Sequence, residues 1–565
     1  MTWIVGKFSK KNDLTHIKDF SSNVKTIHKQ ENLYIAGYGE SLITSLNDPN
    51  NLFIVCGSGI FYDKSFSIMK KYHWEKQFKT NNDFSKLNGH FLIIQIDRNE
   101  IHFSNDPLGL RELFFYDNGK EIFFSTRLDW LIKFIDSTKI NLSYLCSYWN
   151  LENPIIYESI IQDIRFLGPG GKATISSEGL KISNKLWLPE ESDTNINDVI
   201  KILNSLISSL IESGETINLG LSGGIDSRTL LSILLHFDQE SWATYTFGEN
   251  SDFDVKISLN LCKLLKFKCS HYNLQLFEHD DVLGTWQEFV KETNGLMPAN
   301  TYHFLNYYKL LPEKQFFIDG GKGEYIRRGL SNRLALQGKS ALIDKNIEKI
   351  KHFLFKPKPD IFIRELTETW NMDLITQVDS LMQNMPEVSE FGIDNWVDLY
   401  NIRYRTGNCS FPSQTRLDAI TRNFMPFIQP IVLNRIFNLS PKYRQKERIN
   451  HYILKNSIIL KYYPLARYGT IIPFQHNKYT SFMWGKIMSF FVREPSTEKH
   501  LFLHKNREYI LSRLSDIGFV NSQIYNKKKI RKMASDYFKG TRNNANYLIW
   551  WMTFDVWHQL IYEKY

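Results

Sequence analysis

The chain has 565 residues, of which 42% are hydrophobic and 23% are charged, and its formal net charge is +9. This composition is typical of a folded globular protein and excludes an intrinsically disordered chain, while the length predicts two or three domains. The positive charge is modest and spread along the sequence, so it is compatible with an anionic ligand such as ATP or with solubility alone.

Cysteine spacing and apolar runs limit the compartments and partners that the sequence predicts. None of the five cysteines forms a CxxC pair, so neither a zinc site nor a disulfide framework is indicated. The N-terminus lacks the apolar core of a signal peptide, and the apolar run 547–552 is too short to span a bilayer. We therefore expect a cytoplasmic protein with no membrane contact. The basic run 527–532 is interpreted as a solvated helix face, and we do not expect nucleic-acid binding.

The first third of the chain has the pattern of an antiparallel β protein. Short apolar runs are separated by turn residues, and 113–116 and 122–124 flank Asn118-Gly119, which is a strong hairpin signal. We expect residues 1–187 to form a β-rich layered domain. The polar stretch 190–195 is then interpreted as a linker.

Beyond the linker, the pattern changes to alternating strands and helices. Strands are expected over 216–221 and 243–248, a helix over 229–235, and a second helix from about Asp254. Such alternation predicts an α/β fold with a parallel sheet. From about residue 340 the pattern is mainly helical. Residues 196–565 are therefore assigned to a second, α/β domain with a largely helical C-terminal part.

Between the first strand and helix of this second domain, residues 219–228 read LGLSGGIDSR. Glycines at such a turn let the backbone approach a phosphate closely, and the N-terminus of the following helix offers free N–H groups. The alternative is a tight turn that only starts a helix. The flanking elements favour an anion site.

The stretch SGGIDS resembles the pyrophosphate loop of the N-type ATP pyrophosphatases. Its second half, and its place after a β-rich domain, resemble the asparagine synthetase family. The resemblance implies that hydroxyl and N–H groups of the loop surround pyrophosphate and that Asp226 holds Mg²⁺. With the further stretches described next, it assigns the binding of ATP and pyrophosphate to Leu221, Ser222, Gly223, Gly224, Asp226, Ser227, Phe247, Asp319 and Gly320.

Further stretches carry the same resemblance. Phe247 falls where the family backbone contacts adenine, and 317–324 resembles the family's second glycine-rich loop, with Glu324 at its second Mg²⁺-binding carboxylate. Gly321 stands where asparagine synthetases have a glutamate, which leaves the carboxylate substrate open. The segment 424–427 resembles the one that closes the synthetase core. Arg467, counted back from Gly469 and Pro473, matches the lysine of the last catalytic loop. The resemblance thus implies catalytic roles for Asp226, Glu324 and Arg467.

The N-terminal half resembles the glutamine amidotransferase domain of this family, which has the Ntn (N-terminal nucleophile) fold. The signatures are 106–116 and 166–170. The glutaminase cysteine, however, is replaced by Thr2, and the asparagine and glutamate of the glutamine pocket by Ser58 and Ile60. We expect no glutaminase nucleophile; a threonine nucleophile, exposed after removal of Met1, is the alternative. Similar losses occur in β-lactam synthetases and lasso-peptide cyclases.

The resemblance implies an AMP-forming amide ligase that uses ATP and Mg²⁺. A carboxylate is adenylated with release of pyrophosphate, and an amine or ammonia then attacks the acyl carbon. The expected substrates are small molecules or peptides, and the oligomeric state stays open. One alternative is a true asparagine synthetase that uses free ammonia, and another is a non-catalytic nucleotide-binding scaffold.

Overall fold

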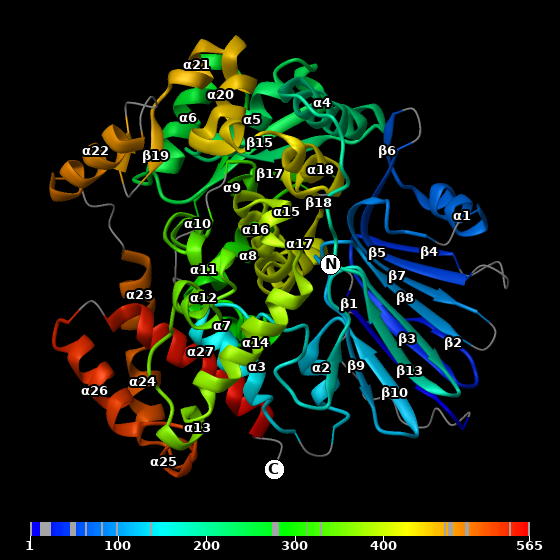
Figure 1. Cartoon of the computed structure of the whole chain (residues 1–565), viewed down its shortest axis with the longest axis vertical. Helices are drawn as coiled ribbons and strands as arrows, with labels where there is room; N and C mark the ends of the chain where they lie inside the picture. The colour runs from blue at the N-terminus through cyan, green and yellow to red at the C-terminus, as the bar shows by residue number, and fades with distance from the viewer. Residues whose placement is uncertain are drawn as a thin grey trace.

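The chain folds into two antiparallel sheets, a parallel sheet and a large helical region (Figure 1). The computed structural model describes residues 3–11, 24–45, 52–62, 65–80, 83–97, 100–135, 138–273, 282–312, 315–327, 330–467, 470–472, 478–491, 497–541 and 544–562. In Figure 1 the antiparallel sheets lie on the right, in blue to cyan, and the last helices lie at the lower left.

The N-terminal region consists of two antiparallel sheets. The first has the strand order β11-β9-β10-β1-β3-β2, and the second has the order β13-β12-β8-β7-β5-β4 with β6 paired to β5. The first sheet contains β1 (Trp3–Ser9), β2 (Lys25–Lys29), β3 (Leu33–Tyr38), β9 (Phe114–Asp117), β10 (Glu121–Ser125) and β11 (Ile164–Phe166). The second contains β4 (Leu42–Ser45), β5 (Leu52–Tyr62), β6 (Phe66–Ile68), β7 (Asn88–Ile96), β8 (Ile101–Asn105), β12 (Gly171–Ser176) and β13 (Gly179–Asn184).

Alternating side chains explain how these sheets are stacked. Along β1, Ile4 and Phe8 point into the core between the two sheets, whereas Trp3 and Val5 point outward and pack with Trp130 of α2 (Leu128–Ile132). Helix α1 (Lys71–Thr80) covers the outer face of the second sheet. The predicted antiparallel, layered arrangement is therefore confirmed.

The predicted hairpin after residue 113 is also confirmed. Strands β9 and β10 pair in antiparallel register, with Phe114 opposite Ser125 and Asp117 opposite Ile122. Gly119 in the turn has a φ of +87°, a left-handed conformation that suits glycine.

The polar connection between the sheets and the second half is held in place by hydrogen bonds. Residues 185–195 form neither strand nor helix. The N–H groups of Glu190 and Ser192 donate to the side chains of Asn434 and Asn438, at 3.0 and 3.1 Å. Both asparagines lie on α18 (Pro430–Asn438), so this connection is attached to the second half along its length.

The second half is built on a five-stranded sheet whose strands are all parallel, in the order β16-β15-β14-β17-β18. This confirms the parallel sheet predicted from the alternation of strands and helices. The strands are β14 (Ile217–Gly220), β15 (Trp242–Phe247), β16 (Cys269–Tyr272), β17 (Phe316–Asp319) and β18 (Arg422–Phe424). Helix α4 (Ile196–Glu212) precedes β14. The helices that follow the strands include α5 (Ile225–Leu234), α6 (Phe253–Leu265), α7 (Val282–Glu292), α8 (His303–Tyr308) and α9 (Gly323–Ile326).

Most of the chain after residue 330 is helical, as predicted, apart from β18 and the small hairpin of β19 (Leu465–Arg467) and β20 (Thr470–Ile472). One stretch, η3 (Asn401–Ser410), is a π-helix. The other helices are α3 (Leu142–Asn150) in the N-terminal region, and α10 (Asn332–Gln337), α11 (Lys339–Ile343), α12 (Ile347–Leu354), α13 (Arg364–Thr367), α14 (Trp370–Asn384), α15 (Val388–Phe391), α16 (Ile393–Tyr400), α17 (Phe411–Ile420), α19 (Pro441–Arg444), α20 (Arg448–Ile453), α21 (Ile458–Tyr462), α22 (Lys478–Phe491), α23 (Thr497–Lys505), α24 (Arg507–Ser515), α25 (Ile517–Asn521), α26 (Lys527–Phe538) and α27 (Ala545–Tyr562).

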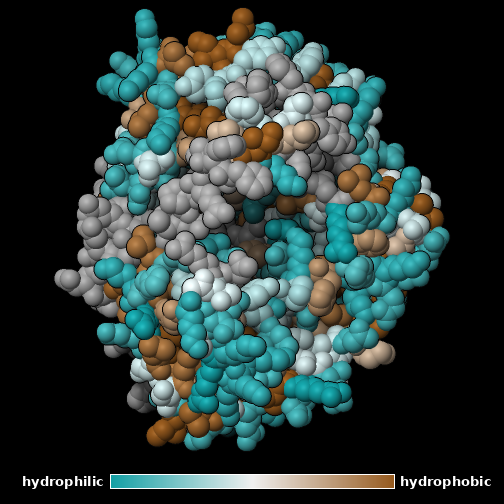
Figure 2. All heavy atoms as spheres, turned by 90° about the vertical axis from the view of Figure 1, so that its left-hand side faces the viewer, coloured by the Kyte–Doolittle hydropathy of each residue, from teal (hydrophilic) through white to brown (hydrophobic). Residues whose placement is uncertain are grey.

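The apolar run at 547–552 lies in α27, where Trp551 and Met552 are fully buried, so its assignment to a core helix is confirmed. No helix among the described residues is long and apolar enough to cross a lipid bilayer. Figure 2 shows the face on the left of Figure 1, which is mixed in hydropathy and hollowed near its centre.

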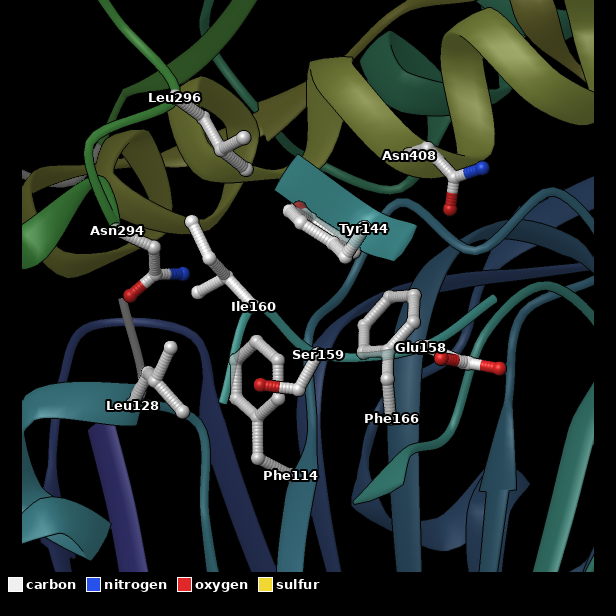
Figure 3. Close-up of a pocket in the computed structure, with 10 residues that line it drawn as sticks. All are labelled: Phe114, Leu128, Tyr144, Glu158, Ser159, Ile160, Phe166, Asn294, Leu296 and Asn408. Carbon is white, nitrogen blue, oxygen red and sulfur yellow. The ribbon is translucent and has the colours of Figure 1, made fainter. Parts of the chain in front are cut away.

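The hydrophobic cores continue across the boundary between the two halves. Ile60 and Phe66 share one apolar core with Leu203 and Leu206 of α4. A second core joins α2 and α3 to α7, α14 and α27. One cavity at this second junction, lined by Leu128, Tyr144 and Asn294 among others, holds about 10 Å³, roughly the space of one water molecule (Figure 3). The two halves are therefore closely packed against each other.

Buried ion pairs also cross this boundary. Arg111, which follows β8, pairs with Asp418 of α17, and both side chains are only 2% exposed. Glu112 pairs with Arg416 at 3.3 Å and accepts a hydrogen bond from Asn294. Burial raises the pKa of Glu112 to about 7, although the charge of Arg416 lowers it. Each charged side chain in these pairs needs its partner, because burying an unpaired charge away from water lowers the stability of the fold.

Replacing one member of the Arg111–Asp418 pair tests this dependence. Asp418→Ala leaves the Arg111 guanidinium buried without its counter-ion, and we expect the free energy of unfolding to fall by about 3–5 kcal/mol. Urea denaturation followed by circular dichroism measures the change. Glu387→Ala is the matched control, since its partner Lys345 and Glu387 itself are both more than half exposed, and it should cost less than about 1 kcal/mol. Equal losses in the two variants would contradict the prediction.

Candidate active site

The glycine-containing loop lies between β14 and α5, at the carboxyl edge of the parallel sheet. Helix α5 begins at Ile225, four residues before the predicted start, so the expectation of a helix over 229–235 was wrong at its N-terminus. Gly224 is the N-cap residue, with extended backbone (φ −79°, ψ 167°). Asp226 and Ser227 therefore belong to the first helical turn, where the N–H groups of a helix favour negative charge.

Three side-chain oxygens fix the shape of the loop. Ser222 N–H donates to Ser227 Oγ at 3.2 Å, and Gly224 N–H donates to Ser222 Oγ at 3.2 Å. Gly223 N–H donates to the carboxylate of Asp254 at 2.5 Å. The sequence predicts that Asp254 lies at the start of α6, and the structure places it there. Its hydrogen bond with Gly223 of the loop is not indicated by the sequence.

The second glycine-rich loop follows β17 and packs directly on the first. Gly220 and Asp319 are partners in the register of β14 and β17. A methyl group on Gly320 would lie 2.7 Å from the backbone nitrogen of Ser227 and 3.0 Å from the carbonyl carbon of Asp226. Only glycine permits this approach. The structure thus brings residues 222–227 and 319–324 together, as the resemblance implies.

Asp226 lies at the centre of this contact and is mostly buried. Arg327 Nε is 3.2 Å from one of its carboxylate oxygens and 3.1 Å from the other, and Asn450 donates to Oδ1 at 3.4 Å. Burial raises the pKa of Asp226 to about 6; the Arg327 guanidinium lowers it, whereas the charges of Glu324 and Glu447 raise it further. The sequence indicates neither Arg327 nor Asn450 as a site residue.

The two predicted metal ligands are close enough for their charges to interact. Glu324 lies in α9, which begins directly after the second glycine loop, and its side chain is partly exposed. Two carboxylates at one edge of a sheet suit Mg²⁺, which prefers oxygen ligands and keeps several waters or phosphate oxygens. In the described part of the chain, no three Asp, Glu, His or Cys side chains gather as a metal site. The other ligands would come from phosphate and water.

Asp319 stabilises the second loop itself. Gly321 N–H donates to its carboxylate at 2.6 Å. Burial raises the pKa of Asp319, and this hydrogen bond lowers it. The carboxylate of Asp319 therefore serves as a hydrogen-bond acceptor for the loop backbone. Gly320 lies beside the first turn of α5. Leu221 is buried, and its N–H donates to Tyr245 at 2.8 Å, so it anchors the first loop to β15.

Phe247 ends β15 in an aromatic group next to the loop. Its ring stacks on Tyr307, with centroids 4.6 Å apart, and meets the edge of Tyr308 at 5.3 Å. Tyr245 and Tyr272 complete the group. An aromatic surface of this kind suits a flat heterocycle. The expected contact of the Phe247 backbone with adenine stays a prediction.

The strand that ends at Arg467 is attached to the first loop. Ala466 N–H donates to the carbonyl of Gly223 at 3.2 Å. The buried Arg228 donates to the same carbonyl at 3.0 Å, to the carbonyl of Tyr463 at 2.7 Å and to that of Pro464. The backbone of Arg467 therefore lies beside the loop. Its side chain, Gly469 and Pro473 lie outside the described residues.

In the N-terminal half, Ser58 and Ile60, which the resemblance aligns with a glutamine pocket, contribute to packing. Ser58 is buried on β5 opposite His90 of β7, and Ile60 belongs to the apolar core shared with α4. His90 accepts a hydrogen bond from Met425 N–H at 3.2 Å, close to the end of β18. Thr2 lies outside the described residues.

No family model matches this sequence, and no curated protein matches it. Among solved structures, similar chains include glutamine phosphoribosylpyrophosphate amidotransferase from B. subtilis, complexed with ADP and GMP. It is 12% identical with a TM-score of 0.19, and the match covers 57% of this chain and 71% of that one. Another is described as the allosteric regulatory enzyme of purine biosynthesis. It is 11% identical with a TM-score of 0.18, over 60% of this chain and 72% of that one. Such scores are too low to establish a shared fold or activity.

The contact between the two loops predicts which glycine can be replaced. In Gly320→Ala the new methyl group meets backbone atoms that cannot move independently, so we expect a loss of about 1–3 kcal/mol in the free energy of unfolding. In Gly224→Ala the nearest atom is the Ser222 hydroxyl at 3.3 Å and φ is negative, so the loss should be below about 1 kcal/mol. Thermal unfolding compares the two variants. If Gly224→Ala proves the more damaging, the described contact is incorrect.

Proposed function

We propose that this chain is an ATP-dependent amide ligase of the kind its sequence resembles, with a glutamine amidotransferase-like region over 1–187 and an asparagine synthetase-like region over 196–565. The observation that carries the proposal is the close packing of two glycine loops at the carboxyl edge of a parallel sheet, with Asp226 and Glu324 beside it. Ligands in open α/β sheets bind at this edge. The low similarity to solved structures adds no argument.

Groups on this edge have the chemistry that ATP requires. The first turn of α5 points N–H groups and a positive dipole end toward the loop, which favours a polyphosphate. Mg²⁺ held by Asp226 and Glu324 would neutralise phosphate charge when bound. The aromatic group around Phe247 lies beside the same loop and suits the adenine ring.

The proposed reaction has two steps. An oxygen of the substrate carboxylate attacks the α-phosphorus of ATP. The bond between the α-phosphorus and the oxygen that bridges the α- and β-phosphates breaks, and pyrophosphate leaves with that oxygen. The loop over Ser222–Ser227 stabilises the charge that develops on pyrophosphate. The nitrogen of an amine or of ammonia then attacks the acyl carbon, loses a proton, and AMP leaves with the electron pair of the broken C–O bond.

Arg467 is the proposed cation for the second step. Its strand is hydrogen-bonded to Gly223, which supports a position near the reacting groups. A guanidinium keeps its charge at all relevant pH values, so it can stabilise an oxyanion or a phosphate but cannot act as a general base. The proton lost by the attacking amine must therefore pass to another group.

Two other functions remain as alternatives to this ligase. A true asparagine synthetase would form asparagine from aspartate and ammonia. A non-catalytic scaffold would bind nucleotide without turnover. Retention of two carboxylates beside a phosphate-type loop supports the enzyme, because a scaffold has no need to keep interacting charges partly buried at this point. Mass spectrometry of the products formed from candidate carboxylates and amines separates these cases.

The adenylation step predicts the effect of losing Asp226. Asp226→Ala should abolish ATP–pyrophosphate exchange, by at least about a hundredfold, in the presence of a carboxylate that supports exchange in the wild type. Exchange of labelled pyrophosphate into ATP is the measurement. Asp238→Ala, an exposed aspartate beyond the other end of the same helix, should exchange at the wild-type rate. Wild-type exchange by Asp226→Ala would remove this residue from the mechanism.

The changes in the N-terminal half predict no glutaminase activity. The purified protein should release no glutamate from glutamine, with or without ATP, because Thr2 replaces the cysteine and Ile60 belongs to an apolar core. A coupled glutamate dehydrogenase assay measures release. Glutamate production that disappears in Thr2→Ala would overturn this prediction and support a threonine nucleophile.

A further inference from the structure

Arg327 is hydrogen-bonded to the carboxylate of Asp226, which the proposed function assigns to a metal ion. Its Nε lies 3.2 and 3.1 Å from the two oxygens of Asp226, so the guanidinium bridges the carboxylate. Other groups surround the same side chain: Gly323 packs against the carboxylate and Asn450 donates to Oδ1. The Arg327 side chain is 28% exposed and that of Asp226 is 17% exposed.

The charges around Asp226 explain why a cation is needed when no ligand is bound. Glu324 and Glu447 are close enough to act on Asp226 electrostatically, and both add negative charge. A partly buried carboxylate beside other carboxylates is unfavourable unless a cation compensates it. Arg327 supplies that charge from the residue that directly follows α9.

A guanidinium and a divalent cation compete for the same side of a carboxylate. Arg327 Nε lies at nearly equal distances from both oxygens of Asp226, where a metal ion would approach the pair, so Mg²⁺ can bind there only if the guanidinium is displaced. Because Arg327 reaches Asp226 through a partly exposed side chain, it can turn toward solvent without any change in the buried packing of the two glycine loops.

We propose that Arg327 is a positioning residue that competes with Mg²⁺ for Asp226. In the free protein it orients the carboxylate, and it is displaced when the metal binds. This inference rests on the proposed assignment of the metal to Asp226. Its consequence is that the protein binds divalent cations more weakly than its carboxylates alone would, so the metal enters the site effectively together with the polyphosphate that offers further oxygen ligands.

Metal binding without nucleotide tests the competition directly. Mn²⁺ serves as the probe, and its dissociation constant is measured by electron paramagnetic resonance at pH 8. Arg327→Gln removes the charge and should tighten Mn²⁺ binding by at least about tenfold, the equivalent of one charge-assisted hydrogen bond. Arg327→Lys, which restores a cation, should return the constant toward the wild-type value. Asp226→Asn should abolish this binding, which locates the metal at Asp226.

Arg333→Gln is the matched control, because Arg333 is an exposed arginine that contacts His352 and Phe353 away from the two loops, and its Mn²⁺ constant should equal that of the wild type. A second measurement guards against poor folding of Arg327→Gln. Addition of Mn²⁺ should raise the thermal midpoint of this variant more than that of the wild type.

The outcomes separate this inference from the proposed function. Equal or weaker Mn²⁺ binding by Arg327→Gln overturns the competition, as does binding that survives Asp226→Asn. Tighter binding by Arg327→Gln in a protein that shows no ATP–pyrophosphate exchange with any carboxylate supports the competition and contradicts the ligase.

Discussion

The close approach of Gly320 to the backbone of Asp226 and Ser227 determines the geometry of the candidate site. It places the second glycine loop on the first turn of α5, and it requires that two parallel strands, β14 and β17, end at the same level. Residues separated by about a hundred positions in the sequence thereby share one edge of a sheet. A side chain at Gly320 would separate the loops, so the helix N-terminus, Asp226 and Glu324 depend on a residue that carries no functional group itself.

Two polar groups of the candidate site already have partners within the chain. Asp254 accepts from Gly223 N–H, a donor that the resemblance assigns to pyrophosphate, and Arg327 pairs with Asp226, an acceptor that it assigns to magnesium. Without a ligand, the site therefore contains an anionic partner for the loop N–H group, Asp254, and a cationic partner for the carboxylate, Arg327. Burial raises the pKa of Asp254, which shows that its charge too is held at some cost in solvation. A ligand bound at this edge would replace these contacts, and its net affinity would be the difference between the new contacts and the ones it replaces.

Much of the fold follows from local sequence patterns, whereas the contacts around the site do not. The hairpin at Asn118-Gly119 and the parallel strands were predictable because turn residues and apolar periodicity act over a few residues. The approach of Arg327 and Asn450 to the loop was not, since each comes from a different segment and no short pattern marks it. The start of α5 was misplaced for a related reason: Asp226 and Ser227 are polar, but the helix continues through them because Gly224 serves as its cap.

Two positions that carry the resemblance in the N-terminal half have structural roles. Ile60 lies where the resembled family has a glutamate, and here it belongs to an apolar core shared with α4, while Arg111, in the stretch 106–116, pairs with Asp418 of the other half. These positions stabilise the junction that also supports β18, the outer strand of the parallel sheet, through the hydrogen bond from Met425 to His90. A glutamate at residue 60 would therefore place a charge in a core that holds the two halves together. The N-terminal sheets therefore contribute to the stability of the second half, which is packed and hydrogen-bonded to them.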